Sequence, residues 1–449
     1  MRKLKSTRDI IFLFIASLIM GGIQTVAAQK RAGLTVREIS LDELIGLATQ
    51  NNLDLKMSQK DSAIAVENIK ATKILKAPYV NVGGNYNFVG NPVLYRGFYS
   101  NDTIIDYYHH QASWNVAAGL PVYLGGRIKT QIAQSETFSS IQNELLLMTE
   151  NKLKLSIITQ FYLLYKLYRE VEIIEENIKN VKINIKQLES RVANGQNLVS
   201  DLLRTQLQLS NFEIEVFKAW NSIDLQSNYL CILSGLPTNT RIQPRSVVLA
   251  IPADSIRYDQ CLQDAFLNRN EIKQSLLQKN LSELTLKVTQ SAAKPAISAS
   301  AIYSSEFPVP GTFPPQPDIL NYWAVGIGLS YDLSSIYNLK HRIKADKIQI
   351  QKEDDNISNV RNLIEQDVKN SYVNFIESKT NIVAYRQNVE RAELNYRIVK
   401  SKYDNEFALI IDMIDAELQV NDSKLSLNKA IIEAIIQYYS LLYSMGKLN

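Results

Sequence analysis

The sequence predicts a mainly α-helical protein with an internal two-fold repeat, long coiled-coil hairpins and four β-strands suited to a shared barrel. Three observations predict this fold. Two parts of the chain match each other at a constant offset, and apolar residues recur at coiled-coil spacing over long stretches without glycine or proline. In addition, four short segments alternate apolar with small or polar residues.

Residues 1–28 have the pattern of a secretory signal peptide. Basic residues precede the apolar run Ile10 to Met20, and Val26-Ala27-Ala28 offers a small-residue cleavage site. The run is about half of the roughly 20 residues that a spanning helix needs, so an amino-terminal membrane anchor is the weaker alternative. Cleavage removes four basic side chains and one acidic one, which lowers the formal charge from +4 to +1. A nearly neutral chain gives no electrostatic reason to expect nucleic acid as a partner.

The internal repeat is carried by the segment ATQNNLDLK, which begins at Ala48, and by AFLNRNEIK, which begins at Ala265. Two further pairs coincide at the same offset: Pro78 with Pro295, and Tyr86 with Tyr303. A spacing shared over roughly forty residues indicates a duplicated unit. We therefore divide the chain as follows: signal peptide 1–28, first structural repeat 36–236, proline-containing linker 237–258, and second structural repeat 259–446. Each repeat is expected to hold a helix, two strands and a pair of long helices.

Four segments are expected to be strands because they alternate over about ten residues. They are PYVNVGGNYNF from Pro78, WNVAAGLPV from Trp114, AISASAIY from Ala296 and WAVGIGLSY from Trp323. One apolar face, one small or polar face and aromatic residues near the ends fit an outer-membrane barrel, although any single strand also fits a soluble sheet. Four strands cannot close such a barrel, so several copies would be needed. The residues expected to face lipid are Trp114, Val116, Trp323, Val325 and Ile327, and Val122 is expected on the same face as Trp114.

The long helices are predicted from the absence of helix breakers and from apolar residues in steps of three and four. No glycine or proline occurs between Gly126 and Gly195, and such a run would reach on the order of 100 Å. The first apolar seam comprises Ile157, Phe161, Leu164, Tyr168, Val171, Ile174, Ile178, Val181, Ile185, Leu188 and Val192. The second comprises Ile382, Tyr385, Val389, Ala392, Tyr396, Val399 and Tyr403. A shorter helix is expected after each turn, over 201–233 and 412–445.

The chain carries no sequence pattern of an enzyme. HExxH, GxSxG, a glycine-rich phosphate loop and CxxC are all missing. The adjacent His109 and His110 could bind a metal, but solvation in a polar loop explains them better. Cys231 and Cys261 are too few for a disulfide scaffold, and their redox state stays open. We therefore predict no enzyme activity and no catalytic, cofactor-binding or metal-binding residues.

Three motifs follow one another within the duplicated unit. LPVYLGGR covers Leu120 to Arg127, GQNLVSD covers Gly195 to Asp201, and YDNEFALIIDMIDA covers Tyr403 to Ala416. In these motifs and their order the chain resembles the TolC family of outer-membrane efflux proteins, over nearly the whole mature sequence. The resemblance implies a homotrimer in the outer membrane of a Gram-negative bacterium. Four strands per chain would form a shared twelve-stranded β-barrel embedded in outer-membrane lipid, and the helices would form a periplasmic tunnel without any cofactor.

The resemblance also implies a function. Such a chain would be a passive exit duct of a tripartite efflux or type I secretion system, opened at its periplasmic tip by an adaptor and an inner-membrane transporter. A different class of protein stays open, namely a periplasmic or surface coiled-coil protein with a structural or adhesive role and no pore. The outward face of the strands discriminates the two, since it would need lipid in one case and a protein core in the other.

By the resemblance, the functional residues fall at a strand-to-helix junction and at two helical turns. Asp412 and Asp415 match a ring of carboxylates at the periplasmic gate. Tyr403 and Asp201 match a pair whose hydrogen bond helps to hold the tip closed. The remaining matches are the adaptor-contacting turns, at Gly195, Leu198, Ser200, Glu406 and Leu409, and the junction, at Gly125, Gly126 and Arg127.

The chain departs from the family pattern at three places. Glu406 stands where a glycine is usual, Ala408 replaces an arginine that adds a second lock, and the second junction, DLSSIYNLKHR, lacks the glycine pair. The two aspartates also have a purely structural explanation, in which Asp412 is a helix N-cap and Asp415 lies in the first turn. Both interpretations can hold together.

Overall fold

The computed structural model describes residues 35–95, 97–98, 102–105, 107–249, 256–312, 316–405 and 407–448. The expected signal peptide, residues 250–255 of the expected linker and Glu406 lie outside the described residues. The chain divides into two compact units, and each draws on both sequence repeats. The hairpin unit comprises Met1–Met57, Leu147–Arg269 and Asn362–Asn449, and the sheet unit comprises Ser58–Leu146 and Asn270–Arg361.

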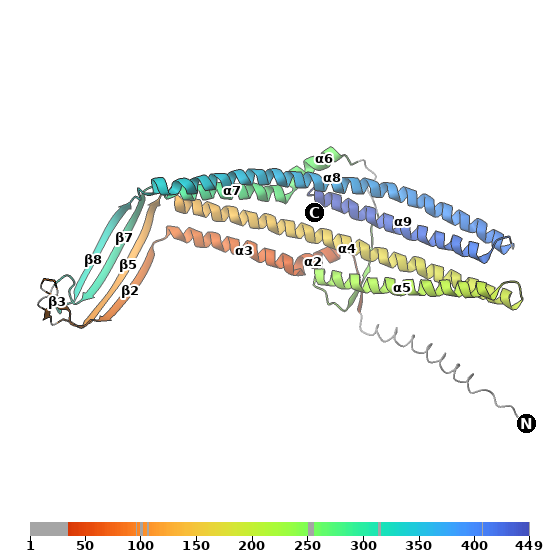
Figure 1. Cartoon of the computed structure of the whole chain (residues 1–449), viewed down its shortest axis with the longest axis horizontal. Helices are drawn as coiled ribbons and strands as arrows, with labels where there is room; N and C mark the ends of the chain where they lie inside the picture. Colours follow the sequence, from red (N-terminus) through yellow and green to blue (C-terminus); the bar gives the residue numbers. More distant parts are fainter. Residues whose placement is uncertain are drawn as a thin grey trace, which may run out of the picture. The chain divides into compact units, whose positions relative to one another are not determined.

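The sheet unit contains an antiparallel four-stranded sheet in the order β2, β5, β7, β8 (Figure 1). Its strands are β2 (Tyr79–Phe88), β5 (His110–Leu124), β7 (Ala296–Phe307) and β8 (Leu320–Ser330). All four strands expected from the alternating pattern are therefore confirmed. Strands β5 and β7 join the two sequence repeats, while β2 and β8 form the edges. Between β2 and β5 lies a small hairpin of β3 (Val93–Tyr95) and β4 (Asp102–Ile104).

The strand register sorts the side chains onto two different faces, because residues directly opposite each other point to the same side of a sheet. One face is rich in aromatic and aliphatic residues and includes Val80, Val82, Trp114, Val116, Tyr303, Trp323, Val325 and Ile327. The other face is mainly small or polar and includes Asn81, Asn85, Asn87, Ser113, Asn115, Ser300, Ser304 and Glu306. On the apolar face Trp323 and Ile327 are 74% and 80% exposed. The five residues expected to face lipid thus share one face of the sheet.

One expected position on this face is wrong. Alternation places Val122 on the same side as Trp114, but a register shift between Pro121 and Tyr123 interrupts the pairing of β5 with β7. Beyond the shift Tyr123 lies opposite Ile297, so Val122 is the extra residue of a β-bulge and Tyr123 takes its place on the apolar face. Proline has no N–H to donate to the ladder, which explains why the pairing breaks here.

The two strand-to-helix junctions are built differently. After β5, Gly125 and Gly126 have φ angles of +65° and +87°, a region that favours glycine. After β8, the Asp332 carboxylate instead accepts hydrogen bonds from the backbone N–H (2.9 Å) and the hydroxyl (2.6 Å) of Ser334. An aspartate turn of this kind joins strand to helix without a left-handed residue, so the second junction forms although its sequence lacks the glycine pair.

Two helical hairpins, α4 with α5 and α8 with α9, supply most of the hairpin unit (Figure 1). The helices are α4 (Arg127–Ala193), α5 (Val199–Ser234), α8 (Ser335–Asp404) and α9 (Ile410–Ser444). Helices α4 and α8 begin in the sheet unit and are 67 and 70 residues long, which confirms the long helices expected from the sequence. The expected seam of α4 is largely buried, whereas the seam of α8 is half-buried in a single chain except at Tyr403.

The single helix expected at the start of each repeat is broken in two. Helix α2 (Leu41–Asn51) precedes α3 (Leu53–Lys73), and α6 (Tyr258–Asn268) precedes α7 (Asn270–Ser291). At the first break the side-chain oxygen Oδ1 of Asn52 accepts a hydrogen bond from the backbone N–H of Leu55 at 3.1 Å. This bond caps the start of α3. At the equivalent second break Arg269 donates to the Asp367 carboxylate at 2.7 Å. A side-chain cap therefore marks the first break, and neither break is at a glycine or proline.

A short parallel pair of strands, β1 (Thr35–Ile39) and β6 (Thr240–Pro244), lies within the hairpin unit. Strand β6 falls inside the range expected to be a linker. It follows α5 and packs over the buried Cys231, whose thiol donates to the backbone oxygen of Thr240 at 3.3 Å. Cys231 and Cys261 are both buried and free.

The main core of the hairpin unit joins α4 to α9. Ile158 and Tyr162 of α4 pack against Ile432, Ile435 and Ile436 of α9.

A 3-10 turn, η1 (Ile74–Lys76), precedes β2 in the sheet unit. None of the helices in the described part of the chain is both long enough and apolar enough to cross a membrane.

Candidate functional site

The turn between α4 and α5 ends α4 with a Schellman motif. Gly195 has φ +71°, its N–H donates to Val192 O at 3.0 Å, and the N–H of Gln196 donates to Arg191 O at 2.9 Å. This pair of bonds satisfies carbonyl groups at the helix end and requires a left-handed residue, which glycine provides most easily. The open space around Gly195 leaves its surface accessible.

The turn between α8 and α9 contains one of the two hydrogen bonds of this motif, the one that spans five residues. The N–H of Phe407 donates to Lys402 O at 2.8 Å, at the spacing of the equivalent bond in the first turn. The side-chain amide of Asn405 donates to Ser401 O at 2.7 Å and so satisfies a further carbonyl group at the end of α8. Glu406, expected to contact the adaptor, lies outside the described residues.

Each turn leads into a helix whose N-cap is a leucine and whose third residue is an aspartate. The N-caps are Leu198 and Leu409, and the aspartates are Asp201 and Asp412. Because Leu409 holds the N-cap position of α9, with φ −83° and ψ 156°, the expectation that Asp412 is itself an N-cap is wrong. Asp412 instead reaches back, and its Oδ2 accepts from the N–H of Leu409 at 3.1 Å. The carboxylate thereby satisfies an N–H that the helix leaves free, where the helix dipole favours negative charge.

The aspartates and the apolar residues of LIIDMID lie on different sides of α9. Asp412 and Asp415 are exposed, and within the described residues neither forms an ion pair. Ile410, Met413 and Ile414 are buried in a cluster with apolar residues of α4 and α8. The packing of the turn therefore needs the apolar residues and leaves both carboxylates free to face solvent or another chain.

The first repeat carries only one of the two aspartates. Asp201 corresponds to Asp412 at the same distance from its N-cap leucine, but Arg204 stands where α9 has Asp415. Capping requires only Asp412, and the expectation that Asp415 lies in the first turn is wrong, because Asp415 is the sixth residue of α9. Asp415 is therefore the residue that capping leaves unexplained.

Tyr403 is buried at the end of α8 among side chains from the first hairpin. The guanidinium carbon of Arg191 lies 5.3 Å from its ring centre, and Arg191 and Asn197 both hydrogen-bond with its hydroxyl. Asp201 is joined to this group through Asn197, whose Nδ2 donates to Asp201 Oδ2 at 3.5 Å. Burial raises the pKa of Tyr403 above its usual value, against the opposing effect of Arg191, so the hydroxyl stays protonated near neutral pH. Tyr403 and Asp201 thus share one site and are linked by Asn197.

The two turns also present apolar side chains to solvent. Leu198 and Leu409 are each 69% exposed, and Phe407 is 84% exposed. A groove of about 510 Å³ lies between the turns, with Arg191, Arg204 and Tyr403 in its lining. Exposed apolar residues beside charged ones are typical of a protein-binding surface.

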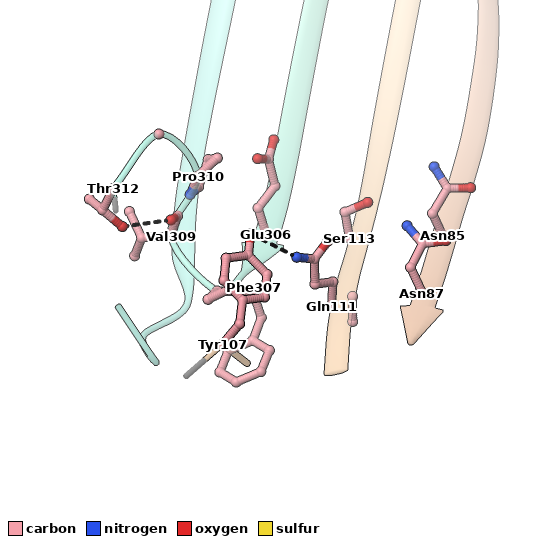
Figure 2. Close-up of a pocket in the computed structure, with 13 residues that line it drawn as sticks. Asn85, Asn87, Tyr107, Gln111, Ser113, Glu306, Phe307, Val309, Pro310 and Thr312 are labelled. Atoms are coloured by element: carbon pink, nitrogen blue, oxygen red, sulfur yellow. Dashed lines mark hydrogen bonds between the residues drawn. The ribbon is translucent and has the colours of Figure 1, made fainter. Parts of the chain in front are cut away.

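A second hollow, of about 310 Å³, lies at one end of the sheet (Figure 2). Five of its lining residues come from the polar face of three strands: Asn85, Asn87, Gln111, Ser113 and Glu306. The side-chain amide of Gln111 donates to the Tyr107 hydroxyl at 3.2 Å, and the Thr312 hydroxyl donates to Val309 O at 3.1 Å. These groups offer hydrogen bonds to polar solutes, and no nucleophile is held by a base among the lining residues.

The adjacent histidines contact neighbouring protein atoms. His109 Nδ1 lies 2.8 Å from Val89 O, and His110 Nδ1 lies 2.6 Å from the Tyr86 hydroxyl. In the part of the chain that the structure describes, no group of three or more His, Cys, Asp or Glu residues could hold a metal ion.

Three residues at the turns were not expected from the sequence: Arg191, Asn197 and Phe407. Arg191 places a cation on Tyr403 from α4, at a tip where Ala408 offers none. Arg191 lies outside the motifs, and Asn197 lies within GQNLVSD, but the contacts of both with Tyr403 depend on packing between hairpins. The sequence does give a weak indication for Phe407, because a large aromatic residue in a turn is exposed unless a partner covers it.

Comparisons with known proteins place these features in a family context. A family model described as outer membrane efflux protein matches residues 44–236 and 261–446. Outer membrane protein TolC of Salmonella enteritidis is 20% identical over 414 residues, which cover 90% of this chain and 81% of that protein. Crystal structures of CusC match with a TM-score of 0.75 and 16% identity over 91% of this chain and 92% of that chain. The structure of VceC from Vibrio cholerae matches with a TM-score of 0.74 and 16% identity over 90% of this chain and 96% of that chain.

Proposed function

Because the chain belongs to the outer membrane efflux protein family, we propose that it is the outer-membrane exit duct of a tripartite efflux or type I secretion system. Its place is the Gram-negative outer membrane, with an extension into the periplasm. Three copies would join their sheets into one twelve-stranded barrel, and their helices would continue as a periplasmic tunnel. The duct would carry solutes passively and would open when an adaptor and an inner-membrane transporter engage its tip.

The observation that carries this proposal is the open, two-faced sheet. Its apolar face exposes large residues such as Trp323 and Ile327, which suits contact with lipid, and its opposite face is small and polar, which suits a water-filled lumen. Strands β2 and β8 each have one neighbour in the described sheet. Unpaired strand edges are costly in hydrocarbon, so a lipid-embedded sheet of this kind requires further strands from other copies.

The turns supply the proposed gate and docking surface. Asp412 and Asp415 are exposed and form no ion pair within the described residues, and Asp415 has no capping role, so a ring formed by three copies would collect negative charge at the tip. Phe407 and Leu409 precede these aspartates in the chain, Leu198 holds the corresponding N-cap position in the first turn, and all three are exposed and would contact the adaptor. Gly195 and Ser200 complete the first of the two turns.

The proposal is tested by reconstituting the purified protein into a planar lipid bilayer. We expect a small, cation-selective conductance that divalent cations block when they are added on the side of the helical turns. The control is a preparation that was unfolded by heat before reconstitution. Absence of any channel activity from protein that remains folded and trimeric in detergent would contradict the proposal.

Membrane extraction separates the duct from a coiled-coil protein without a pore. A duct should stay in the outer-membrane fraction through salt and carbonate washes and should dissolve only in detergent. The protein should be retained because its extraction into water would expose the apolar face of the sheet, which is costly. Release by carbonate alone would favour the protein without a pore.

The closed tip is tested by Tyr403→Phe. Loss of the hydroxyl leaves Arg191 and Asn197 without this partner, so the contact between the hairpins weakens and the mean conductance should rise. The effect should be modest, since one net hydrogen bond contributes about 1 kcal/mol. Single-channel recording measures it, with Tyr385→Phe, at a more exposed tyrosine of α8, as the control. Equal conductance of wild type and Tyr403→Phe would exclude a role of the hydroxyl in closing the tip.

A further inference from the structure

A buried carboxylate lies on the side of α9 that faces away from the exposed aspartates. Glu417 is five residues beyond Asp412 and two beyond Asp415, which turns it to the opposite side of the helix. It is only 5% exposed, and neither Oε1 nor Oε2 has a hydrogen-bond partner. A buried carboxylate without partners is costly when it is charged, so its surroundings decide its protonation state.

Glu417 lines a cavity of about 410 Å³ between α4, α8 and α9. All the residues that line this cavity belong to the hairpin unit. One turn further along α9, Asn421 accepts a hydrogen bond from the Asn177 side chain of α4 at 2.5 Å. Asn180 of α4 also lines the cavity. Asn177 therefore has a partner at Asn421, while the Glu417 carboxylate has none among the described residues.

Among the described residues, the charged groups around the cavity form no ion pair with Glu417. The titratable residues that face it are Glu176 from α4, Glu393, Tyr396, Arg397 and Lys400 from α8, and Lys424 from α9. Lys424 pairs with Glu393 at 3.3 Å. The Lys400 ammonium lies over the ring of Tyr396, 5.9 Å from its centre, and forms no ion pair with Glu417 within the described residues. With Glu417 neutral, the two acidic and three basic side chains that face the cavity carry a net charge of +1, but in the described part of the chain none of the three cations forms an ion pair with Glu417.

We propose that Glu417 is a protonation switch for the packing of α4, α8 and α9 near the turns. The packed helices hold the side chain in its neutral form. Its ionisation brings an unpaired charge into the interior and favours separation of α9 from α4 and α8, which lets water reach the carboxylate. This inference concerns helix packing, goes beyond the proposed function and does not rest on it.

The direction of the pH dependence follows from the burial of Glu417. Burial raises the pKa of this carboxyl from 4.5 to about 7, while Lys400 opposes the shift. When the helices separate, the group returns to its ordinary pKa and releases its proton more readily. The packed state therefore binds more protons, and it loses stability as the pH rises from 4.5 to about 7, with no further loss above that value.

Hydrogen exchange of the full-length protein tests the switch without requiring any channel activity. Peptides that cover residues 410–424 should exchange faster as the pH rises from 5.5 to 8, after correction for the intrinsic exchange rate. Linkage sets an upper limit of about 30-fold for this acceleration. Glu417→Gln, which carries no charge at any pH, should remove the pH dependence. The matched control is Glu433→Gln, at an exposed position of the same helix, which should retain it.

A second variant keeps the test decisive if Glu417→Gln does not fold. Lys400→Met removes the charge that opposes protonation, so the acceleration should continue to a higher pH than in the wild type. The proposal is overturned if Glu417→Gln and wild type share the same pH dependence, or if neither wild type nor Lys400→Met shows any. Exchange that depends on cation concentration at fixed pH would identify a bound cation in place of the proton. Absence of channels together with the expected exchange would contradict the duct and leave the switch intact.

Discussion

Replacing Asp412 and Asp415 together by asparagine is expected to remove the cation selectivity of the reconstituted channel. In a trimer the two positions would supply six carboxylates to one ring. Neighbouring carboxylates about 6 Å apart repel by about 3 kcal/mol at an effective dielectric of 20, so the ring favours cations strongly. Loss of the charges should bring the permeability ratio of potassium to chloride close to that of an uncharged pore and should weaken block by divalent cations at least about tenfold.

Asparagine is the informative substitution because Asp412 also stabilises the start of α9. Its Oδ2 accepts from the N–H of Leu409 at 3.1 Å, and an asparagine oxygen can accept the same bond. Alanine at this position would remove both the charge and the bond, at a cost of about 1 kcal/mol to the helix start. Comparison of the asparagine and alanine pairs therefore separates electrostatics from capping.

The single variants divide the effect between the two positions. Asp415→Asn should retain the helix start and lose part of the selectivity, since Asp415 makes no capping bond. Glu189→Gln, at an exposed carboxylate of α4, is the matched control and should leave selectivity and block unchanged. Reversal potentials in a salt gradient measure the selectivity. A double variant with wild-type selectivity and block would place the gate elsewhere.

Much of the fold could be predicted because its main elements are long and periodic. The alternation around Trp114 and Trp323 fixes strands with two unlike faces, and an uninterrupted seam such as that from Ile157 to Leu188 fixes a long helix. The same reasoning fails where one residue changes the geometry. Pro121 interrupts the pairing of β5, and Asn52 caps a new helix in the middle of a helical pattern. In neither place does the spacing of apolar residues in the sequence change.

The candidate site was predictable only where it follows local motifs. Gly195 belongs to a turn whose chemistry can be read from a short sequence, whereas the leucine N-caps could not be predicted, because the sequence favours Asp412 as the cap. The partners of Tyr403 could not be predicted, because Arg191 and Asn197 reach it from another hairpin. Glu417 looks like any glutamate of a helix surface, and only packing against α4 and α8 reveals that it is buried.

Gly125→Ala is expected to destabilise the protein strongly at the first strand-to-helix junction. Gly125 has φ +65°, and a left-handed conformation costs a residue with a Cβ about 1–2 kcal/mol. The added Cβ would also lie 2.5 Å from Ser291 O and 2.9 Å from the Cβ of Lys294. That carbonyl accepts a backbone hydrogen bond from Lys294 at the end of α7, so it cannot move away without loss of the bond. Strain and overlap together should cost at least about 3 kcal/mol.

Gly126→Ala provides a matched control for this prediction. Its φ is +87°, but a Cβ there would meet nothing within 4 Å, so it carries the backbone strain without the overlap. The temperature at which helical circular dichroism is lost, scanned at one rate, should fall much further for Gly125→Ala than for Gly126→Ala. A fixed rate is needed because unfolding of such proteins is often irreversible. Equal falls for the two variants would mean that the approach to Ser291 is not what requires glycine. The first junction would then depend on backbone conformation alone, unlike the second, where the Asp332 carboxylate accepts hydrogen bonds from Ser334.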